Sequence, residues 1–190
     1  MAIELQAGHS TPIRAPGGEP LRRVLFGVGW DPVRRFGLWG LLGLPGRADL
    51  DAACTVIDVD GRLVDQIDPG HVQSHDTSIV HSGDNPSGEG EGDDEQIYVD
   101  LWRMHHTRYS LVFTVTSVTG KRFERIANPF ARLVDKESET ELVRYRLALE
   151  PRCVSYVVAT LRCGDDGWEM TAHGAGLQAP PTIEVLSAYR

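Results

Sequence analysis

Short runs of β-branched and aromatic residues, separated by glycine and proline, recur along the whole chain. The run 110–118 (SLVFTVTSV) is apolar almost throughout and predicts a core strand. The run 141–149 alternates polar and apolar side chains, which predicts a strand with one face in water. The dipeptide Asp60-Gly61 lies between two β-rich runs and indicates a hairpin. The pattern therefore favours strands over helices.

About ten candidate strands can be placed in this way, and no long amphipathic helix is evident. They cover residues 2–13, 21–30, 52–59, 62–67, 77–81, 96–102, 110–118, 141–149, 153–163 and 168–172. Segment 123–134 is ambiguous because Asn128-Pro129 interrupts it, and the tail from Ala179 fits an edge strand or a helix. The chain shows no internal repeat and no break in composition. We expect a single all-β domain over residues 1–190, a β-sandwich of two mostly antiparallel sheets with long acidic loops at one end.

The charge of the chain is concentrated in one place. The net charge is −8, and six of the 27 acidic side chains lie within residues 83–95. Nucleic-acid-binding proteins show basic patches, so this balance argues against nucleic acid as a partner and in favour of cations. Three scattered cysteines form no disulfide framework and no Cys-x-x-Cys zinc motif: Cys54, Cys153 and Cys163.

The first residues carry neither a basic flank nor an apolar core, so we expect no signal peptide. No apolar stretch approaches the length of a membrane span. A cytoplasmic location is the expectation that follows.

The acidic segment 83–95 reads GDNPSGEGEGDDE and has nothing to bury. Calcium takes six to eight oxygen ligands from carboxylates, amides and backbone carbonyls, and glycine lets a chain turn its carbonyls inward. The composition therefore suits a calcium cage, although a solvated surface loop is the simpler alternative. The segment is not an EF-hand, and its glycine spacing and acidity do not fit a phosphate-binding loop.

Three further carboxylates lie close to predicted strand ends. Asp49 and Asp51 are two residues apart and face one side of an extended chain, and Asp31 follows the strand 21–30. If these strand ends gather at one end of the sandwich, the carboxylates converge with the acidic segment. Together they offer enough oxygens for one or two calcium ions.

Several motifs occur in the same order as in the TerD-type tellurium-resistance family, which this chain resembles over most of its length. They are GVGWD (27–31), DLDAAC (49–54), GDNPSGEGEGDDE (83–95), VFTVTS (112–117), FERIANPFARLVD (123–135) and GWEMTAHGAGL (167–177). The resemblance implies a β-sandwich in a bacterial, cytoplasmic stress-response protein. It implies a non-catalytic scaffold or binding module that holds calcium between acidic loops and works with other proteins of a stress-response complex.

The family's metal-site positions carry over by motif. They fall on Asp31, Asp49, Asp51, Asp84, Asn85, Gly88, Gly90, Asp93, Asp94 and Glu95. Side-chain ligands are expected foremost from five of them: Asp49, Asp51, Asp84, Asp93 and Asp94. Asn85 is a further candidate, and Gly88 and Gly90 would contribute backbone carbonyls.

The chain departs from the family's pattern between Asp31 and Asp49, where it is apolar. This apolar loop, 36–46, is either a lid over the end of the sandwich or a docking surface for a protein or membrane. Arginines on both sides would suit an anionic surface such as the inner face of the membrane. The candidate docking residues are Phe36, Leu38, Trp39, Leu41 and Leu42.

Two other functions stay open. A metal-dependent phosphoesterase would use the acidic cluster with His81 as general acid or base. A purely structural protein would use the acidic segment only as a surface. Zinc is not favoured, because His71, His75 and His81 have no cysteine partner and no helical spacing.

Overall fold

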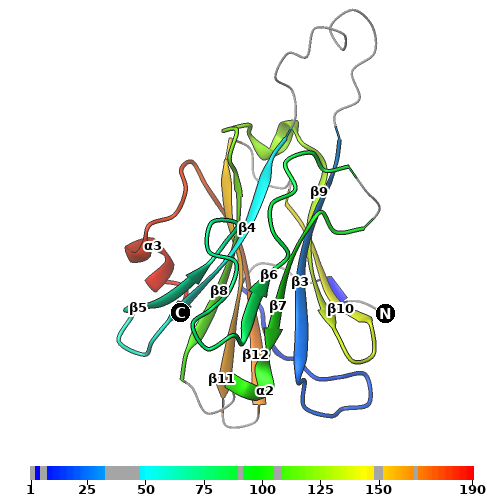
Figure 1. Ribbon diagram of the computed structural model, residues 1–190, viewed down its shortest axis with the longest axis vertical. Coiled ribbons are helices and arrows are strands. Elements are labelled where there is room, and N and C mark those ends of the chain that lie inside the picture. Colours follow the sequence, from blue (N-terminus) through cyan, green and yellow to red (C-terminus); the bar gives the residue numbers. More distant parts are fainter. Residues whose placement is uncertain are drawn as a thin grey trace, which may run out of the picture.

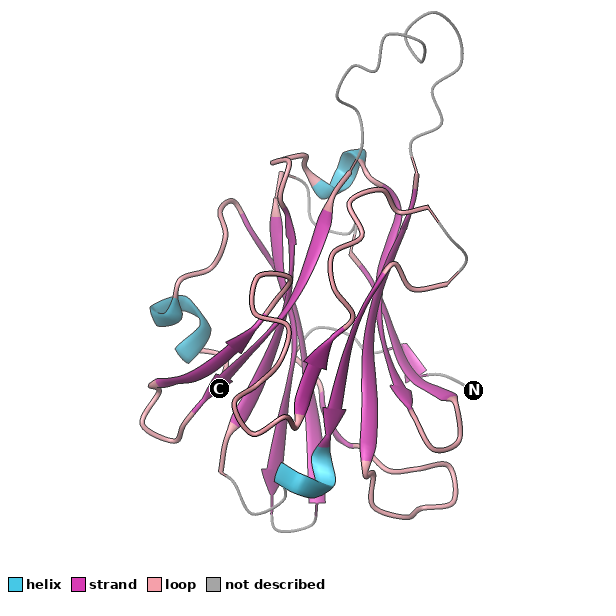
Figure 2. Cartoon of the chain, in the orientation of Figure 1, coloured by secondary structure: helices cyan, strands magenta, loops and turns pink. Residues whose placement is uncertain are grey.

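The computed structural model describes residues 3–4, 8–32, 48–89, 92–104, 108–147, 152–164 and 167–190. Within these ranges the chain forms two facing β-sheets of six strands each (Figures 1 and 2). All strand pairs are antiparallel except the pairing of β1 with β10. The predicted sandwich of mostly antiparallel sheets is therefore confirmed.

One sheet holds, in spatial order, β1 (Ile3–Glu4), β10 (Thr140–Arg146), β9 (Ala127–Asp135), β3 (Arg23–Asp31), β7 (Glu95–Asp100) and β6 (Ile79–His81). The other holds β2 (Ser10–Pro12), β12 (Gly167–Leu177), β11 (Ser155–Gly164), β8 (Ser110–Ser117), β4 (Leu50–Ile57) and β5 (Leu63–Ile67). The hairpin expected at Asp60-Gly61 joins β4 to β5. Both β5 and β6 are edge strands, each of its own sheet.

The core lies between the sheets, where alternate side chains of both inner faces interdigitate. Phe26 of β3 stacks on Phe113 of β8 across this space, with ring centroids 4.6 Å apart. On β3 the inward positions 24, 26, 28 and 30 belong to the core, so the intervening positions face outward. This alternation determines which side chains of β3 point into the core and which lie on the outer face of the sheet.

The outer face of the second sheet is also covered. Helix α3 (Ile183–Ser187) places Leu186 in a small cluster with Ile57, Val112 and Val157. This second apolar layer explains why 110–118 is apolar without alternation, since β8 is buried on both faces. The tail expected as strand or helix is therefore a helix.

Two segments differ from the simplest expectation. The strand predicted over 2–13 is divided between β1 and β2, which lie in different sheets. The ambiguous segment 123–134 begins with a 3-10 turn (η1, Phe123–Arg125) and continues as β9, where Asn128 takes a φ of 49°. One further short helix, α2 (Leu101–Met104), follows β7.

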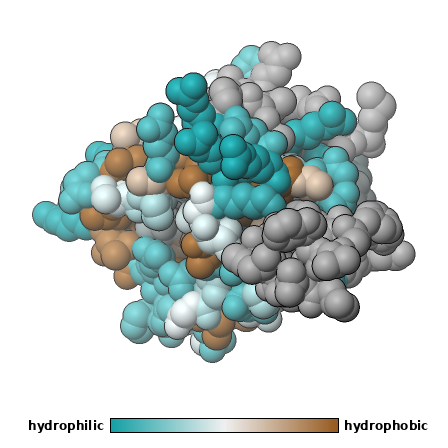
Figure 3. All heavy atoms as spheres, turned by 90° about the horizontal axis from the view of Figure 1, so that it is seen from above, coloured by the Kyte–Doolittle hydropathy of each residue, from teal (hydrophilic) through white to brown (hydrophobic). Residues whose placement is uncertain are grey.

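The end of β3, the start of β4 and the connection from β6 to β7 lie at the same end of the sandwich (Figure 1). Seen from that end, hydrophilic residues cover much of the surface that the structure describes (Figure 3). None of the helices among the described residues is long and apolar enough to cross a membrane.

Candidate metal centre

Three carboxylates converge at this end of the molecule. Asp49 and Asp51 lie at the start of β4, and Asp84 lies in the connection between β6 and β7. One oxygen from each lies within 4.8 Å of one oxygen of both others. We call this group the acidic triad. Strand β5 pairs with β4 only from Cys54 onward, so the start of β4 is open to the connection that carries Asp84.

In the described part of the chain, no lysine or arginine forms an ion pair with the acidic triad. The Oδ1 atom of Asp49 is buried and has no hydrogen-bond partner within the described part of the chain. A buried carboxylate oxygen left this way is costly and needs a counter-charge or a donor.

The pKa values of the triad reflect this repulsion. Burial, and then the charges of Glu95, Asp49 and Asp84, raise the pKa of Asp51 to about 6 from its ordinary 3.8. Burial, and then Asp84 and Glu95, also raise the pKa of Asp49. Neighbouring His81 works in the opposite direction on Asp51, but it does not outweigh the carboxylates. The folded protein therefore holds these groups against their mutual repulsion.

Glu95 is fully buried, and its carboxylate forms hydrogen bonds to the backbone beside the acidic triad. Its Oε2 accepts a hydrogen bond of 2.7 Å from the N–H of Ala52, and its Oε1 accepts one of 3.3 Å from the N–H of Asn85. Nε2 of His81 lies 3.4 Å from the same Oε2 and 3.1 Å from the carbonyl oxygen of Ala52. Glu95 thus ties the first sheet to the backbone of β4 in the second.

The tautomer of His81 follows from its contacts. Its Nδ1 accepts a hydrogen bond of 3.0 Å from the N–H of Gly83. The ring proton must then sit on Nε2, where the carbonyl oxygen of Ala52 and the carboxylate of Glu95 accept. The side chain of His81 is fully buried, so both ring nitrogens are committed to structure.

Trp30 holds the acidic segment in place. Its backbone N–H donates to Oδ2 of Asp94 at 2.9 Å, and its indole N–H donates to the carbonyl oxygen of Ala48 at 3.1 Å. Gly88 packs against the indole at a φ of 61°, and a Cβ there would lie 2.3 Å from Nε1 of Trp30. Only glycine satisfies both the close approach and the left-handed backbone.

Asn85 and Asp94 shape the connection rather than join the acidic triad. The side-chain amide of Asn85 donates to Oδ1 of Asp94 at 3.2 Å, while its oxygen accepts from the N–H and hydroxyl of Ser87. Burial raises the pKa of Asp94, the hydrogen bond from Trp30 works against that, and the neighbouring carboxylates raise it further. Asp94 therefore adds negative potential close to the triad.

Asp93 points away from the triad. Its carboxylate lies over Gly27 on the outer face of the first sheet and receives two hydrogen bonds from Arg132 of β9, of 2.7 and 3.0 Å. Arg132 also contacts Glu141 at 3.1 Å, and Arg144 completes the chain of charges. We call this group the arginine-paired chain. The structure thus places this expected ligand in an internal ion pair.

Of the remaining expected positions, the structure describes Asp31 but not Gly90. Asp31 is exposed and accepts a hydrogen bond from the amide of Asn128. Gly90 and the docking candidates Phe36, Leu38, Trp39, Leu41 and Leu42 fall outside the described residues. Sequence reasoning missed Arg132, because it lies 39 positions from Asp93 and only strand pairing brings the two together.

This chain is similar to known proteins in its sequence and in its fold. The TerD domain family model matches residues 1–186. Tellurium resistance protein TerZ of Serratia marcescens is 41% identical over 155 residues, which cover 81% of this chain and 80% of that protein.

Two further likenesses cover nearly the whole chain. Stress response protein SCP2 of Bacillus subtilis is 32% identical over the full length of both chains. The crystal structure of a homologue of telluride resistance protein (TerD) from Streptomyces coelicolor superposes with a TM-score of 0.69. It is 21% identical and covers 85% of this chain and 93% of its own, which supports the fold. The family match and these sequence identities show that the chain belongs to the TerD family, whose named members are tellurium-resistance and stress-response proteins.

Proposed function

We propose that this TerD-family protein is a non-catalytic calcium-binding module of a bacterial stress response, with the acidic triad as its ion site. The observation that carries the proposal is the buried Oδ1 of Asp49, which has no hydrogen-bond partner among the described residues and belongs to a group of three carboxylates. Calcium supplies what such a group needs, because it is a hard dication that prefers oxygen ligands. Asp49, Asp51 and Asp84 would hold the ion.

The donor set fits calcium better than a softer metal. The triad offers carboxylate oxygens only, and His81 is turned inward to Glu95 and Ala52. Transition metals such as zinc prefer imidazole and thiolate ligands. A site of three carboxylates therefore favours a hard dication such as calcium over a transition metal such as zinc.

The burial of His81 argues against the phosphoesterase alternative. A general acid or base must exchange its proton with substrate, and the His81 side chain is fully buried with both nitrogens engaged. A scaffold or binding module whose loops are ordered by the ion is the function that the geometry supports best. Within a stress-response complex, such a module would present ordered loops to partner proteins.

Isothermal titration calorimetry with calcium chloride tests the proposal on the purified chain. We expect calcium binding by the parent protein and a loss of about tenfold or more in affinity for Asp49→Asn, because ligand charge count tunes calcium affinity. The matched control is Asp60→Asn, which removes an exposed carboxylate paired with Arg62 in the β4–β5 hairpin. Absence of calcium binding by the parent protein, or equal loss in both variants, would contradict the proposal.

A further inference from the structure

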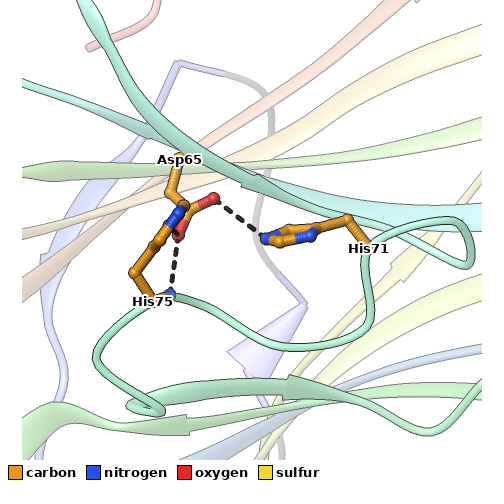
Figure 4. Close-up of side chains that lie close together, drawn as sticks. All are labelled: Asp65, His71 and His75. Carbon is orange, nitrogen blue, oxygen red and sulfur yellow. Dashed lines mark hydrogen bonds and ion pairs between the residues drawn. The ribbon is translucent and has the colours of Figure 1, made fainter.

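A second group of metal-ligand side chains lies away from the acidic triad. Asp65 of β5 contacts His71 and His75, both of which lie in the connection from β5 to β6 (Figure 4). Nε2 of His71 is 3.3 Å from Oδ1 of Asp65, and Nδ1 of His75 is 2.9 Å from Oδ2. One ligand atom from each of the three residues lies within 4.8 Å of the other two. We call this group the histidine cluster.

The surrounding backbone holds the histidine cluster in position. Oδ2 of Asp65 also accepts a hydrogen bond of 3.0 Å from the backbone N–H of His75. Asp68 fixes the turn before His71, since its Oδ1 accepts from the N–H groups of Gly70 and His71 at 2.9 and 3.0 Å. Both imidazoles are therefore brought to one carboxylate by local structure.

A second turn fixes the other side of His75. Oδ1 of Asp76 accepts hydrogen bonds from the hydroxyl groups of Ser74 and Ser78, and Arg103 donates to the carbonyl and hydroxyl oxygens of Thr77. Thr77 itself adopts a φ of 61°. The connection is thus clamped at both ends, and the imidazole rings stand between the clamps with centroids 5.8 Å apart.

The ligand types differ from those of the acidic triad. Two imidazole nitrogens and one carboxylate oxygen suit zinc and its first-row neighbours, whereas calcium takes oxygen. With bonds of about 2.0–2.1 Å, tetrahedral ligands lie about 3.4 Å apart. Each imidazole nitrogen lies about this far from one oxygen of Asp65, His71 at 3.3 Å from Oδ1 and His75 at 2.9 Å from Oδ2, and one ligand atom from each residue lies within 4.8 Å of the other two.

The exposure of the three side chains favours a site with room for adjustment. The Asp65 side chain is 11% exposed, while those of His71 and His75 are 48% and 85% exposed. A largely buried carboxylate supplies a fixed point, and the two rings beside it are more exposed to solvent. Their open side would leave coordination positions for water or for a ligand from another molecule.

We propose that the histidine cluster is a surface site for a divalent transition metal ion of the zinc class, separate from the calcium site. The ion would tie β5, at the edge of one sheet, to the connection that leads to β6, at the edge of the other. It would therefore brace the open side of the sandwich. This inference is independent of calcium binding, because it depends on different residues and a different ligand chemistry.

Zinc chloride titrated calorimetrically into the full chain, with calcium chloride present in excess, tests the inference. We expect zinc binding by the parent protein and a loss of about tenfold or more in affinity for the double variant His71→Asn, His75→Asn. His9→Asn is the matched control, since His9 is exposed and lies outside the cluster. Zinc should also raise the melting temperature of the parent protein and not that of the double variant.

The result can overturn the inference in two ways. Absence of zinc binding by the parent protein overturns it, and so does zinc binding that persists in the double variant. If that binding is lost in Asp49→Asn, it belongs to the acidic triad. Far-ultraviolet circular dichroism checks that the double variant folds. Should it not fold, the single variant His75→Asn decides, because that side chain is the most exposed of the three.

Discussion

The acidic segment supplies carboxylates to two very different environments. Asp93 joins the arginine-paired chain, where Arg132 and Arg144 neutralise Asp93 and Glu141. Asp84 joins the acidic triad, where no lysine or arginine of the described residues pairs with Asp49, Asp51 or Asp84. Two carboxylates nine residues apart in one loop thus meet opposite electrostatic conditions.

The shifts in pKa express the same contrast. The hydrogen bond from Arg144, opposed by burial and aided by Arg132, lowers the pKa of Glu141. Burial and neighbouring carboxylates raise the pKa of Asp51 to about 6. A carboxylate whose charge is balanced inside the chain stabilises the fold, whereas an unbalanced group needs an external cation. The acidic segment therefore contains both a carboxylate neutralised within the chain and a carboxylate of the proposed ion site.

The largest expected effect comes from breaking the arginine-paired chain. Arg132→Met should lower the free energy of unfolding by about 3 kcal/mol, because it leaves the almost fully buried Asp93 carboxylate without its partner. Urea denaturation measures the change. Calcium affinity should stay within about twofold of the parent protein. A loss below about 1 kcal/mol would mean that Asp93 is not held by this pair in solution.

Calcium should produce the next largest effect. At a free concentration about 100 times its dissociation constant, it should stabilise the parent protein by about 2.7 kcal/mol. Differential scanning calorimetry in calcium and in EDTA gives this difference. Asp49→Asn should abolish it, and Arg132→Met should retain it even though that variant is less stable. The comparison breaks down if both variants lose the calcium effect equally.

Removing one charge from the triad should stabilise the calcium-free protein. In EDTA at pH 7.5, Asp51→Asn should be about 1 kcal/mol more stable than the parent protein, a figure discounted for partial solvent screening. The reason is that the mutation relieves repulsion from Asp49, Asp84 and Glu95. Urea denaturation in EDTA measures the gain. A destabilised variant would show that Asp51 already has a partner.

The same variant predicts a pH dependence. The folded pKa of Asp51 is about 6, above its ordinary 3.8, so the folded state holds this proton more tightly than the unfolded state. Its contribution to stability is fully present below about pH 3.8 and is lost as the pH rises through about 6. The advantage of Asp51→Asn should therefore shrink as the pH falls from 7.5 to 4. Urea denaturation of the parent protein and of Asp51→Asn at a series of pH values measures the contribution of this carboxyl group to stability.

The smallest expected effect is the control. Asp60 is exposed and pairs only with Arg62 at the surface of the hairpin. Asp60→Asn should change the free energy of unfolding by less than about 0.5 kcal/mol, in calcium and in EDTA alike. Thermal unfolding under both conditions checks this. A larger change would mean that net charge, rather than position in the triad, controls the calcium response.

Much of the architecture could be predicted from local pattern. Apolar runs and the turn at Asp60-Gly61 predicted the strands, and the order of motifs predicted the family. Hydrophobic periodicity works here because most strands bury one face in the core between the sheets, while β8, which is buried on both faces, is apolar almost throughout. The division of 2–13 between two sheets was missed, because strand pairing depends on distant partners.

For the site, the sequence alone determined that carboxylates, glycines and an Asp49–Asp51 pair stand near strand ends. Tertiary structure decided which carboxylates share a site. Asp93 and Glu95 are two residues apart, yet one faces outward to Arg132 and the other lies in the interior. The chain bends at Gly92 and Asp94, so the two-residue period of a strand does not hold there.

The histidine cluster shows the same limit. His71 and His75 have a spacing that metal sites use, but the sequence does not show that Asp65 joins them, because the two clamped turns of the β5–β6 connection bring the three together. The sequence states which charged groups the chain contains. Their neutralisation depends on distances between residues far apart in the chain, because electrostatic interactions act through space and fall off with separation.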